Sequence, residues 1–172
     1  EILITVEGHH QAAPDDIDRA MRDLEALLGR PLRFANDADC FALSEASDGA
    51  ATGAHVVFGV IVGTGTGGGI VVDGRPVAGP NGIAGEWGHN PLPWPRAEEL
   101  PGPACYCGLS GCIETWLSGP GLANDYRQLT GETLEAIGIA RRADDGDALS
   151  QQTLARHADR MARALASVIN II

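Results

Sequence analysis

The apolar run VVFGVIV, residues 56–62, and the glycine-rich turn GTGTGGG, residues 63–69, carry the strongest fold signal in the sequence. An unbroken apolar run of this length is typical of a buried central strand. Ile70 to Val72 supplies a second strand, and Asp73-Gly74 is a strong hairpin signal before a third strand over 75–78. These residues predict a small sheet built from hairpins.

The residues before this sheet predict alternating strands and helices. Short strands are expected over 2–6 and 32–35, and a helix of small residues over 38–47. Between the two strands, either residue of Asp15-Asp16 can cap a helix that ends at Gly29. The apolar face of that helix is expected to be Ile17, Met21, Leu24 and Leu28.

The residues after the sheet divide into an aperiodic segment and a helical region. Residues 79–111 are rich in glycine and proline and have no period, so this long segment is expected to be functional, metal-held or both. From Ile113 onward the pattern is helical, and the whole chain is therefore predicted to be α/β. The last helix has an apolar face at helical spacing: Leu154, Met161, Leu165, Val168 and Ile172.

Composition and charge exclude several classes of partner. The 172 residues are 44% hydrophobic and 20% charged, as in an ordinary globular domain. A net charge of −11 argues against nucleic acid, whose phosphates require Lys and Arg, and is attributed mainly to solubility. No apolar run approaches the ~20 residues of a membrane span and the first residues do not resemble a secretion signal, so a cytoplasmic protein without a membrane partner is expected. The apolar end, Val168 to Ile172, predicts a truncated domain.

The clearest chemical signal is a set of metal-ligand residue types. Cys105, Cys107 and Cys112 occur within eight residues, and His89 lies sixteen residues before the first of them. A Cys3His set is typical of a closed, tetrahedral, structural zinc site. The alternative is three free buried thiols and an unrelated histidine. The fourth cysteine, Cys40, is distant and is predicted to be a core residue.

The glycine-rich turn matches the dinucleotide-binding pattern G-x-G-x-x-G at Gly63, Gly65 and Gly68. The match is weak because that pattern requires a helix directly after it, whereas a strand is expected here, and the turn lacks the lysine of a P-loop. A glycine-rich turn between strands can nevertheless present backbone N–H groups and hydroxyls to phosphate oxygens. The candidate phosphate contacts are Gly63, Thr64, Gly65 and Thr66. The alternative is a tight turn that binds nothing.

Three carboxylates are candidates for contacts with a hydroxyl-bearing substrate. Asp37 follows Asn36 at the end of a predicted strand, where it could accept the proton of an attacking hydroxyl. The alternative is an ordinary turn. Glu86 and Glu114 lie within three residues of the presumed zinc ligands, so zinc would bring them together, where they could accept hydrogen bonds from sugar hydroxyls. The alternative is two ordinary surface glutamates.

Four motifs occur along the chain: Asn36-Asp37-Ala38, Gly63-Thr64-Gly65, Gly85-Glu86-Trp87-Gly88-His89 and Cys105-x-Cys107-Gly108-x-x-Gly111-Cys112-Ile113-Glu114. In order and spacing they resemble the ROK family, which comprises repressors, uncharacterised reading frames and sugar kinases. The last two motifs are highly specific. The resemblance extends from about Leu24 to the end of the chain.

The resemblance implies an actin-like, hexokinase-like (ribonuclease H-like) fold of two lobes with a sugar in the cleft. It implies that Asp37 is the general base and that Thr64 and Gly65 approach the phosphates of ATP, which is used with Mg²⁺. It also implies that His89 both ligates zinc with the three cysteines and contacts the sugar. The implied sugar contacts are Asn36, Glu86, His89 and Glu114.

The chain departs from the family pattern at both ends. Nothing in Glu1 to Asp23 resembles the Asp-x-Gly-Gly-Thr phosphate loop with which ROK kinases begin, and residues 1–14 match no part of the family. The adenosine-contacting Gly-Gly of the family would fall after Ile172. We therefore expect residues 1–172 to be a single sugar-binding, zinc-carrying region of a ROK protein, truncated at both ends.

These features predict an ATP-dependent hexose kinase. The run from Glu86 to Trp94 is similar to bacterial fructokinases and manno(fructo)kinases, so fructose is the first expected substrate, with N-acetylglucosamine kinases as an alternative. A second hypothesis is the sugar-sensing domain of a ROK repressor, which would not need Asp37 as a base. A third is a zinc-stabilised scaffold without chemistry. The expected ligands are a hexose, ATP with Mg²⁺ and structural zinc, and a homodimer stays open.

Overall fold

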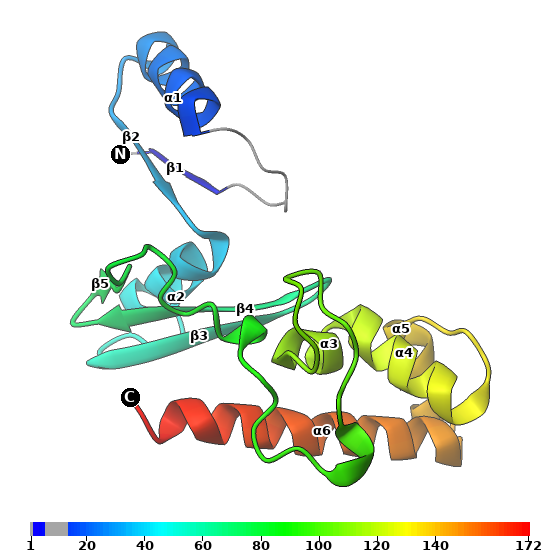
Figure 1. The fold of residues 1–172 in the computed structure, drawn as a ribbon. Coiled ribbons are helices and arrows are strands. Elements are labelled where there is room, and N and C mark those ends of the chain that lie inside the picture. Colours follow the sequence, from blue (N-terminus) through cyan, green and yellow to red (C-terminus); the bar gives the residue numbers. More distant parts are fainter. Residues whose placement is uncertain (1, 6–13) are drawn as a thin grey trace. The chain divides into compact units, whose positions relative to one another are not determined.

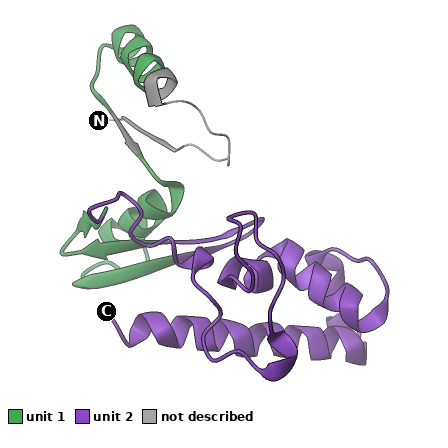
Figure 2. Ribbon diagram, in the orientation of Figure 1, with its two compact units in different colours: residues 1–59, 69–78 green, residues 60–68, 79–172 purple. Residues whose placement is uncertain are grey.

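The computed structural model describes residues 2–5 and 14–172, with side chains from residue 18 onward except those of residues 33 and 34. Val6, the side chains of Asp15 and Asp16 and that of Ile17 therefore lie outside the described residues. Figure 1 shows the order of helices and strands, and Figure 2 shows the two compact units into which the chain divides. The first unit comprises Glu1–Gly59 and Gly69–Ala78, and the second comprises Val60–Gly68 and Gly79–Ile172.

The first unit begins with a strand–helix–strand arrangement, as predicted. Strand β1 (Ile2–Thr5) pairs in parallel with β2 (Leu32–Ala35), and the partners run from Ile2 opposite Leu32 to Thr5 opposite Ala35. Helix α1 (Pro14–Leu28) connects them, because parallel strands need a crossover connection. The helix ends at Gly29, whose φ of 60° gives the left-handed conformation common after helices.

Helix α2 (Asp37–Ser47) follows directly and packs on the hairpin of β3 (Val56–Val62) and β4 (Thr66–Val72). A Cβ atom on Gly69 would collide with the backbone carbonyl of Ala38. The glycine at this position therefore allows the helix to approach the strand closely. The buried core of this contact is Ala42, Val57 and Val71.

Two details of the predicted sheet are wrong. The described sheet has the strand order β3-β4-β5, so β4 is its middle strand, and β3 has exposed ends with Val56 46% and Val62 40% exposed. The turn is also shorter than residues 63–69, since β4 begins at Thr66. Four residues that were predicted to lie in the turn, 66–69, therefore belong to strand β4. Glycine is present in this strand because it allows close packing against α2, as at Gly69, and not only because it permits a turn.

The second hairpin is confirmed. Strand β5 (Arg75–Pro76) pairs antiparallel with β4, with Val72 opposite Arg75. Asp73 and Gly74 have positive φ values of 48° and 73° between the two strands. Positive φ at both central residues is the geometry of the two-residue hairpin turn that Asp-Gly favours.

The helical region from Ile113 onward is also confirmed. The Ser118 hydroxyl accepts a hydrogen bond from Gly121 N–H, and the Asp147 carboxylate accepts one from Ser150 N–H, so each residue caps the helix that follows it. The four helices of this region are α3 (Ile113–Leu117), α4 (Gly119–Thr130), α5 (Ala136–Asp144) and α6 (Ala148–Ile169). Their buried apolar cluster is Leu122, Tyr126 and Ile139.

The face that α6 buries differs from the predicted one. Ile172 lies beyond the end of the helix and is exposed, and the other four residues of the predicted face are only half-buried. The buried residues of the helix are Ser150, Thr153, Arg160 and Ala164. The prediction failed because it counted apolar residues alone, whereas this helix packs partly through a charged side chain. No helix in the described ranges is both long and apolar enough to cross a membrane.

The segment over residues 79–111 has little regular structure, as predicted. It contains the short 3-10 helices η1 (Trp87–His89) and η2 (Ala97–Glu99). Two isolated antiparallel bridges connect Pro91 with Cys112 and Ala104 with Ser110. These bridges bring both ends of the segment between His89 and Cys105 close to the start of α3.

Candidate functional site

The four predicted metal ligands come together in the second unit. His89 is the last residue of η1, Cys105 and Cys107 lie in the loop after η2, and Cys112 directly precedes α3. Their candidate ligand atoms all lie within 4.8 Å of one another. We call this group the thiol–imidazole cluster.

Distances within the cluster fit a tetrahedral zinc ion. Cys105 Sγ lies 3.6 Å from His89 Nδ1, and Cys107 Sγ lies 3.7 Å from Cys112 Sγ. Tetrahedral zinc with Zn–S bonds of about 2.3 Å and Zn–N bonds of about 2.0–2.1 Å places two sulfurs about 3.8 Å apart. The same geometry places a sulfur and a nitrogen about 3.6 Å apart. The donor set and its spacing therefore both suit zinc.

Local backbone pairing forms the cluster. Cys105 N–H donates to the carbonyl of Leu109 at 2.8 Å, which closes a small loop that contains Cys107. Ile113 N–H donates to the carbonyl of Asn90 at 2.9 Å. This bond holds the residue after His89 beside the residue after Cys112. The four ligands thus converge through hydrogen bonds that their own sequence neighbours make.

The thiols of the cluster differ in their affinity for protons. Burial, followed by the hydrogen bonds with Cys107 and Cys105, raises the pKa of Cys112 to about 12. A backbone hydrogen bond at Leu109 is the main factor that lowers the pKa of Cys107. Because a coordinated thiol loses its proton, metal binding here would displace the Cys112 proton, and affinity would fall on acidification.

Tyr106 contacts the histidine of the cluster and was not predicted as a site residue. Its hydroxyl lies 2.7 Å from His89 Nε2, and the two rings meet edge to face with centroids 5.0 Å apart. Most of the Tyr106 side chain is exposed, but partial burial of its hydroxyl, followed by the negative charges of Glu114, Cys105 and Glu86, raises the pKa of Tyr106 to about 12. His89 therefore presents Nδ1 to the thiols and Nε2 to a neutral phenol, an arrangement that fixes the orientation of a metal-ligating imidazole.

Glu114 connects the cluster with the glycine turn. It lies in α3, two residues after Cys112, and its Oε2 accepts a hydrogen bond of 3.0 Å from Thr66 N–H. A Cβ atom on Gly65 would lie 2.6 Å from that same oxygen, so a larger residue here would require the Glu114 carboxylate to shift. The predicted sugar contact and the predicted phosphate turn are thus in direct contact within one unit.

The four candidate phosphate contacts have different environments. Gly63 N–H donates to the carbonyl of Gly65, and Thr66 N–H is bonded to Glu114. The Thr66 side chain is buried, and its hydroxyl has no hydrogen-bond partner among the described residues. Thr64, by contrast, is exposed. Thr64 is therefore the best placed of the four for an external phosphate.

Glu86 also influences Tyr106. It is exposed and directly precedes η1, and its charge is one of those that raise the pKa of Tyr106. The next residue, Trp87, is buried and donates its indole N–H to the carbonyl of Gly67 at 2.8 Å. This bond anchors η1 to β4, so the backbone next to Glu86 has a fixed position. Glu86 and Glu114 thus both influence Tyr106 beside the cluster, and their contact with a sugar stays a prediction.

Asn36 and Asp37 lie in the first unit, at the start of α2. Asn36 is the N-cap, and its side-chain oxygen accepts a hydrogen bond of 2.8 Å from Ala38 N–H. One carboxylate oxygen of Asp37 also lies 2.8 Å from that N–H, and the residue is half-buried. The pair therefore has a structural role as a helix cap. The second oxygen of Asp37 is the atom on which a role as base would depend.

Comparison with known proteins decides the family. The sequence profile described as "ROK family" matches residues 5–172, so the expectation that residues 1–14 match no part of the family is wrong for residues 5–14. The chain belongs to the ROK family. Its α/β fold is that of the actin-like sugar kinases, as expected from the motifs.

Several ROK proteins are similar over most of this chain. An N-acetyl-D-glucosamine kinase from Pectobacterium carotovorum subsp. carotovorum (strain PC1) is 42% identical over 153 residues, which is 87% of this chain and 50% of that protein. The crystal structure of a ROK hexokinase from Thermus thermophilus matches 87% of this chain and 50% of its own, with 36% identity and a TM-score of 0.78. A ROK family transcriptional regulator, a homologue of the E. coli MLC protein, matches 88% of this chain and 39% of its own, with 27% identity and a TM-score of 0.75. The chain spans about half the length of the curated relatives that it matches.

Sequence reasoning missed two groups of residues around this ROK site. Tyr106 could have been found, since it stands between two metal ligands and carries a hydrogen-bonding group. Glu99 and the arginines of α6 could not have been found from the sequence, because their contacts join residues more than sixty positions apart.

Proposed function

We propose that this chain is the sugar-binding, zinc-holding part of an ATP-dependent sugar kinase. The observation that carries the proposal is the hydrogen bond between Thr66 N–H and Glu114. Phosphoryl transfer is achieved mainly by positioning, so a kinase needs its phosphate turn beside its acceptor site. A turn and an acceptor carboxylate that touch within one unit meet that need. The relatives that are named as kinases support the same reading.

The residues have separate roles in the proposed reaction. Glu86 and Glu114 accept hydrogen bonds from sugar hydroxyls and thereby orient the sugar. Asp37 accepts the proton of the hydroxyl that attacks the terminal phosphoryl group of MgATP, and ADP leaves. Thr64 and Gly65 N–H contact the phosphates. When bound, zinc supplies a fixed connection among His89 and the three cysteines, which orders the backbone next to Glu86 and Glu114.

The sugar is proposed to be a hexose or its 2-acetamido derivative. N-Acetyl-D-glucosamine is the first candidate, since the 42% identical relative is named as a kinase of that sugar. Fructose, which the run from Glu86 to Trp94 favours, is the second candidate, and the named relatives do not support it specifically. The cytoplasmic location and a homodimer stay predictions.

Calorimetric titration of sugars into the zinc-loaded chain, followed by an assay of sugar-dependent ADP release, tests the proposal. We expect saturable binding of one sugar, with the affinity lost in Glu114→Gln and unchanged in the control Glu98→Gln, an exposed glutamate. Asp37→Asn should keep the sugar affinity and remove any ADP release, because it deletes only the base. Binding of none of N-acetylglucosamine, glucose, mannose and fructose would contradict the proposal.

A second candidate function is sugar sensing without phosphorylation. The regulator structure with a TM-score of 0.75 favours it, since that fold serves transcription in its own context. A sensing domain would bind sugar with equal affinity in the presence and absence of MgATP and release no ADP. In a kinase, the affinity for sugar should depend on whether MgATP is bound, and the release of ADP should require Asp37.

A further inference from the structure

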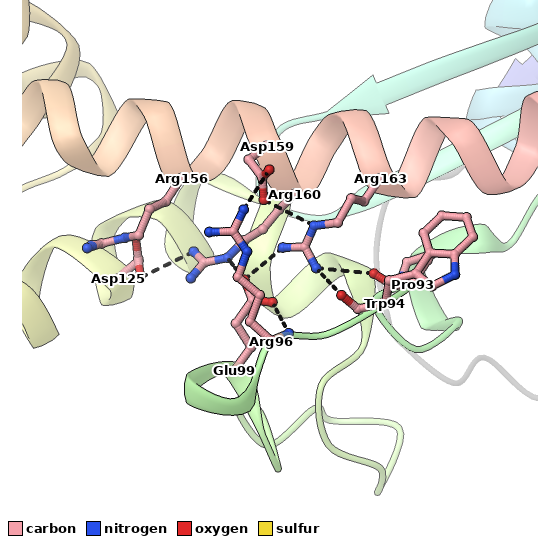
Figure 3. Close-up of polar contacts among 9 residues, drawn as sticks. All are labelled: Pro93, Trp94, Arg96, Glu99, Asp125, Arg156, Asp159, Arg160 and Arg163. Atoms are coloured by element: carbon pink, nitrogen blue, oxygen red, sulfur yellow. Dashed lines mark hydrogen bonds and ion pairs between the residues drawn. The ribbon is translucent and has the colours of Figure 1, made fainter.

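A group of buried charges connects the segment between two metal ligands with the last helix (Figure 3). Glu99, at the end of η2, receives hydrogen bonds of 2.8 Å from Arg160 Nε and from Arg163 Nη2. Both arginines belong to α6. We call these three residues the Glu99–arginine cluster.

The charges of this cluster are nearly removed from water. The side chains of Glu99 and Arg160 are each 5% exposed, and that of Arg163 is 15% exposed. The Arg96 N–H also donates to Glu99 Oε2 at 2.9 Å. A buried charge without its partners is costly, so loss of one of these contacts should weaken the others.

The Glu99–arginine cluster contacts the connecting segment, which we define as residues 90–104, at several residues. Arg163 Nη1 donates to the carbonyls of Pro93 at 3.2 Å and of Trp94 at 2.8 Å, four and five residues after His89. Glu99 lies six residues before Cys105. The connecting segment therefore has the thiol–imidazole cluster at both its ends and α6 at its middle.

Arg160 also reaches the element that follows the last metal ligand. Its guanidinium lies 4.3 Å from the ring centroid of Trp116, in α3, and 3.2 Å from an oxygen of Asp125, in α4. Because α3 begins directly after Cys112, one arginine contacts both chain segments that carry metal ligands. The segment with His89 and Cys105 is held through Glu99, and the segment with Cys112 is held through Trp116.

We propose that the Glu99–arginine cluster is a positioning device for the metal site: it keeps His89 and Cys105 within ligand distance of Cys107 and Cys112, and so limits the rate at which zinc leaves. The inference rests on the proposed zinc site. Without the cluster, the middle of the connecting segment would lose its buried contacts with α6, and only the backbone bonds near its ends and the exposed Arg96–Asp159 pair would hold it in the absence of a metal. A dissociated ligand could then move farther from the ion. With the cluster intact, a dissociated ligand stays near the ion and rebinds.

The test uses zinc-loaded chain and measures the rate of zinc release to a colorimetric chelator, together with the melting temperature. Glu99→Gln and Arg163→Met should release zinc about tenfold faster than the unaltered chain, the size of effect typical of groups that orient metal ligands. The matched controls are Glu98→Gln, an exposed neighbour in η2, and Arg156→Met, which removes an arginine of α6 that pairs with Asp125. Both controls should release zinc at the rate of the unaltered chain. Arg163→Met retains the ion pair between Glu99 and Arg160. We therefore expect this variant to fold and to be measurable even if Glu99→Gln unfolds.

The outcomes separate the positioning role from general stability and from the zinc site itself. Faster release in Glu99→Gln and Arg163→Met alone supports the proposal. Variants that melt at a lower temperature but release zinc at the unaltered rate overturn it, as does equal acceleration in Arg156→Met. If the unaltered chain takes up no zinc, the proposed metal site fails first and the positioning role fails with it.

Discussion

The connecting segment, residues 90–104, is flanked at its two ends by His89 and Cys105 of the thiol–imidazole cluster and is held at its middle by buried charges. The ligands of the thiol–imidazole cluster lie close together in sequence, and short backbone bonds such as that from Cys105 to Leu109 bring them together. The Glu99–arginine cluster joins residues that are 61 and 64 positions apart. The first arrangement depends on local chain geometry and, in the proposed zinc site, on a metal. The second depends on the packing of α6 against the rest of its unit. The thiol–imidazole cluster and the Glu99–arginine cluster should therefore be disrupted by different substitutions and different solution conditions.

Removal of one thiol should have the largest effect. Cys107→Ser deletes one of four ligands, and structural zinc contributes about 10–16 kcal/mol in small zinc-dependent peptides. We expect the variant to lose its zinc and, in hydrogen exchange, the protection of residues 86–112. Cys40→Ser is the control, since Cys40 lies in the first unit outside the thiol–imidazole cluster. A Cys107→Ser chain that kept its metal and melting temperature would show that the ligand assignment is wrong.

Loss of the central arginine should come next. Arg160→Met removes the side chain that contacts Glu99, Asp125 and Trp116, and we expect the free energy of unfolding to fall by about 3 kcal/mol. This loss is at the lower end of the range for breaking a buried ion pair, because Glu99 still has its hydrogen bond with Arg163 in the variant. Arg156→Met should cost about 1 kcal/mol or less, since Arg156 is 27% exposed. Urea unfolding measures both, and equal losses would contradict the special role of the buried cluster.

Acidification should weaken the Glu99–arginine cluster in a defined range. Burial alone would raise the pKa of Glu99, but hydrogen bonds from Arg163, Arg96 N–H and Arg160 lower it from 4.5 to about 2. The folded state therefore binds the proton less readily than the unfolded state, so this stabilisation is present above pH 4.5 and is lost as the pH falls toward 2. The contribution is on the order of 3 kcal/mol.

The measurement compares unfolding of the metal-free chain with that of metal-free Glu99→Gln between pH 7 and pH 2. Metal-free protein is used because protonation of the ligands would otherwise add its own pH dependence. The difference in unfolding free energy should shrink on acidification in the range from 4.5 to 2. A difference that stayed constant would mean that Glu99 titrates normally.

The smallest effect is expected at Tyr106. Tyr106→Phe removes the hydroxyl that lies 2.7 Å from His89 Nε2 and keeps the ring contact. An exposed hydrogen bond of this kind contributes about 0.5–1.5 kcal/mol, so zinc affinity should fall about two- to tenfold with little change in melting temperature. Tyr126→Phe is the control, because the Tyr126 hydroxyl binds Arg142 within the helical region. Equal zinc affinity in Tyr106→Phe and the unaltered chain would leave Tyr106 without a role in orienting His89.

The same contrast explains how far the sequence predicted the structure. The hairpin at Asp73-Gly74, the strand–helix–strand start and the convergence of the four candidate metal ligands were all predicted. Each is indicated by a local signal, such as a turn dipeptide, a helix end or a group of metal-ligand residue types. The middle position of β4 was missed, since glycine in a strand reveals a close approach only when the opposing helix is known.

The site was predicted in part for the same reason. The nearness of Glu86 and Glu114 to the cluster followed from their spacing to its ligands. The contact of Glu114 with Thr66 did not, because it joins residues 48 positions apart. Arg160 appeared in the sequence only as a polar residue in an amphipathic helix, and no local pattern indicates that it is buried between Glu99 and Asp125.

Metal analysis of the purified chain decides whether the zinc site exists. We expect one zinc per chain, bound by His89, Cys105, Cys107 and Cys112, and none in Cys107→Ser. Cys40→Ser should keep the full amount of zinc. A chain that binds no zinc after loading, or a Cys107→Ser variant that binds as much as the unaltered chain, would contradict the metal site on which the proposed sugar contacts and the positioning role depend.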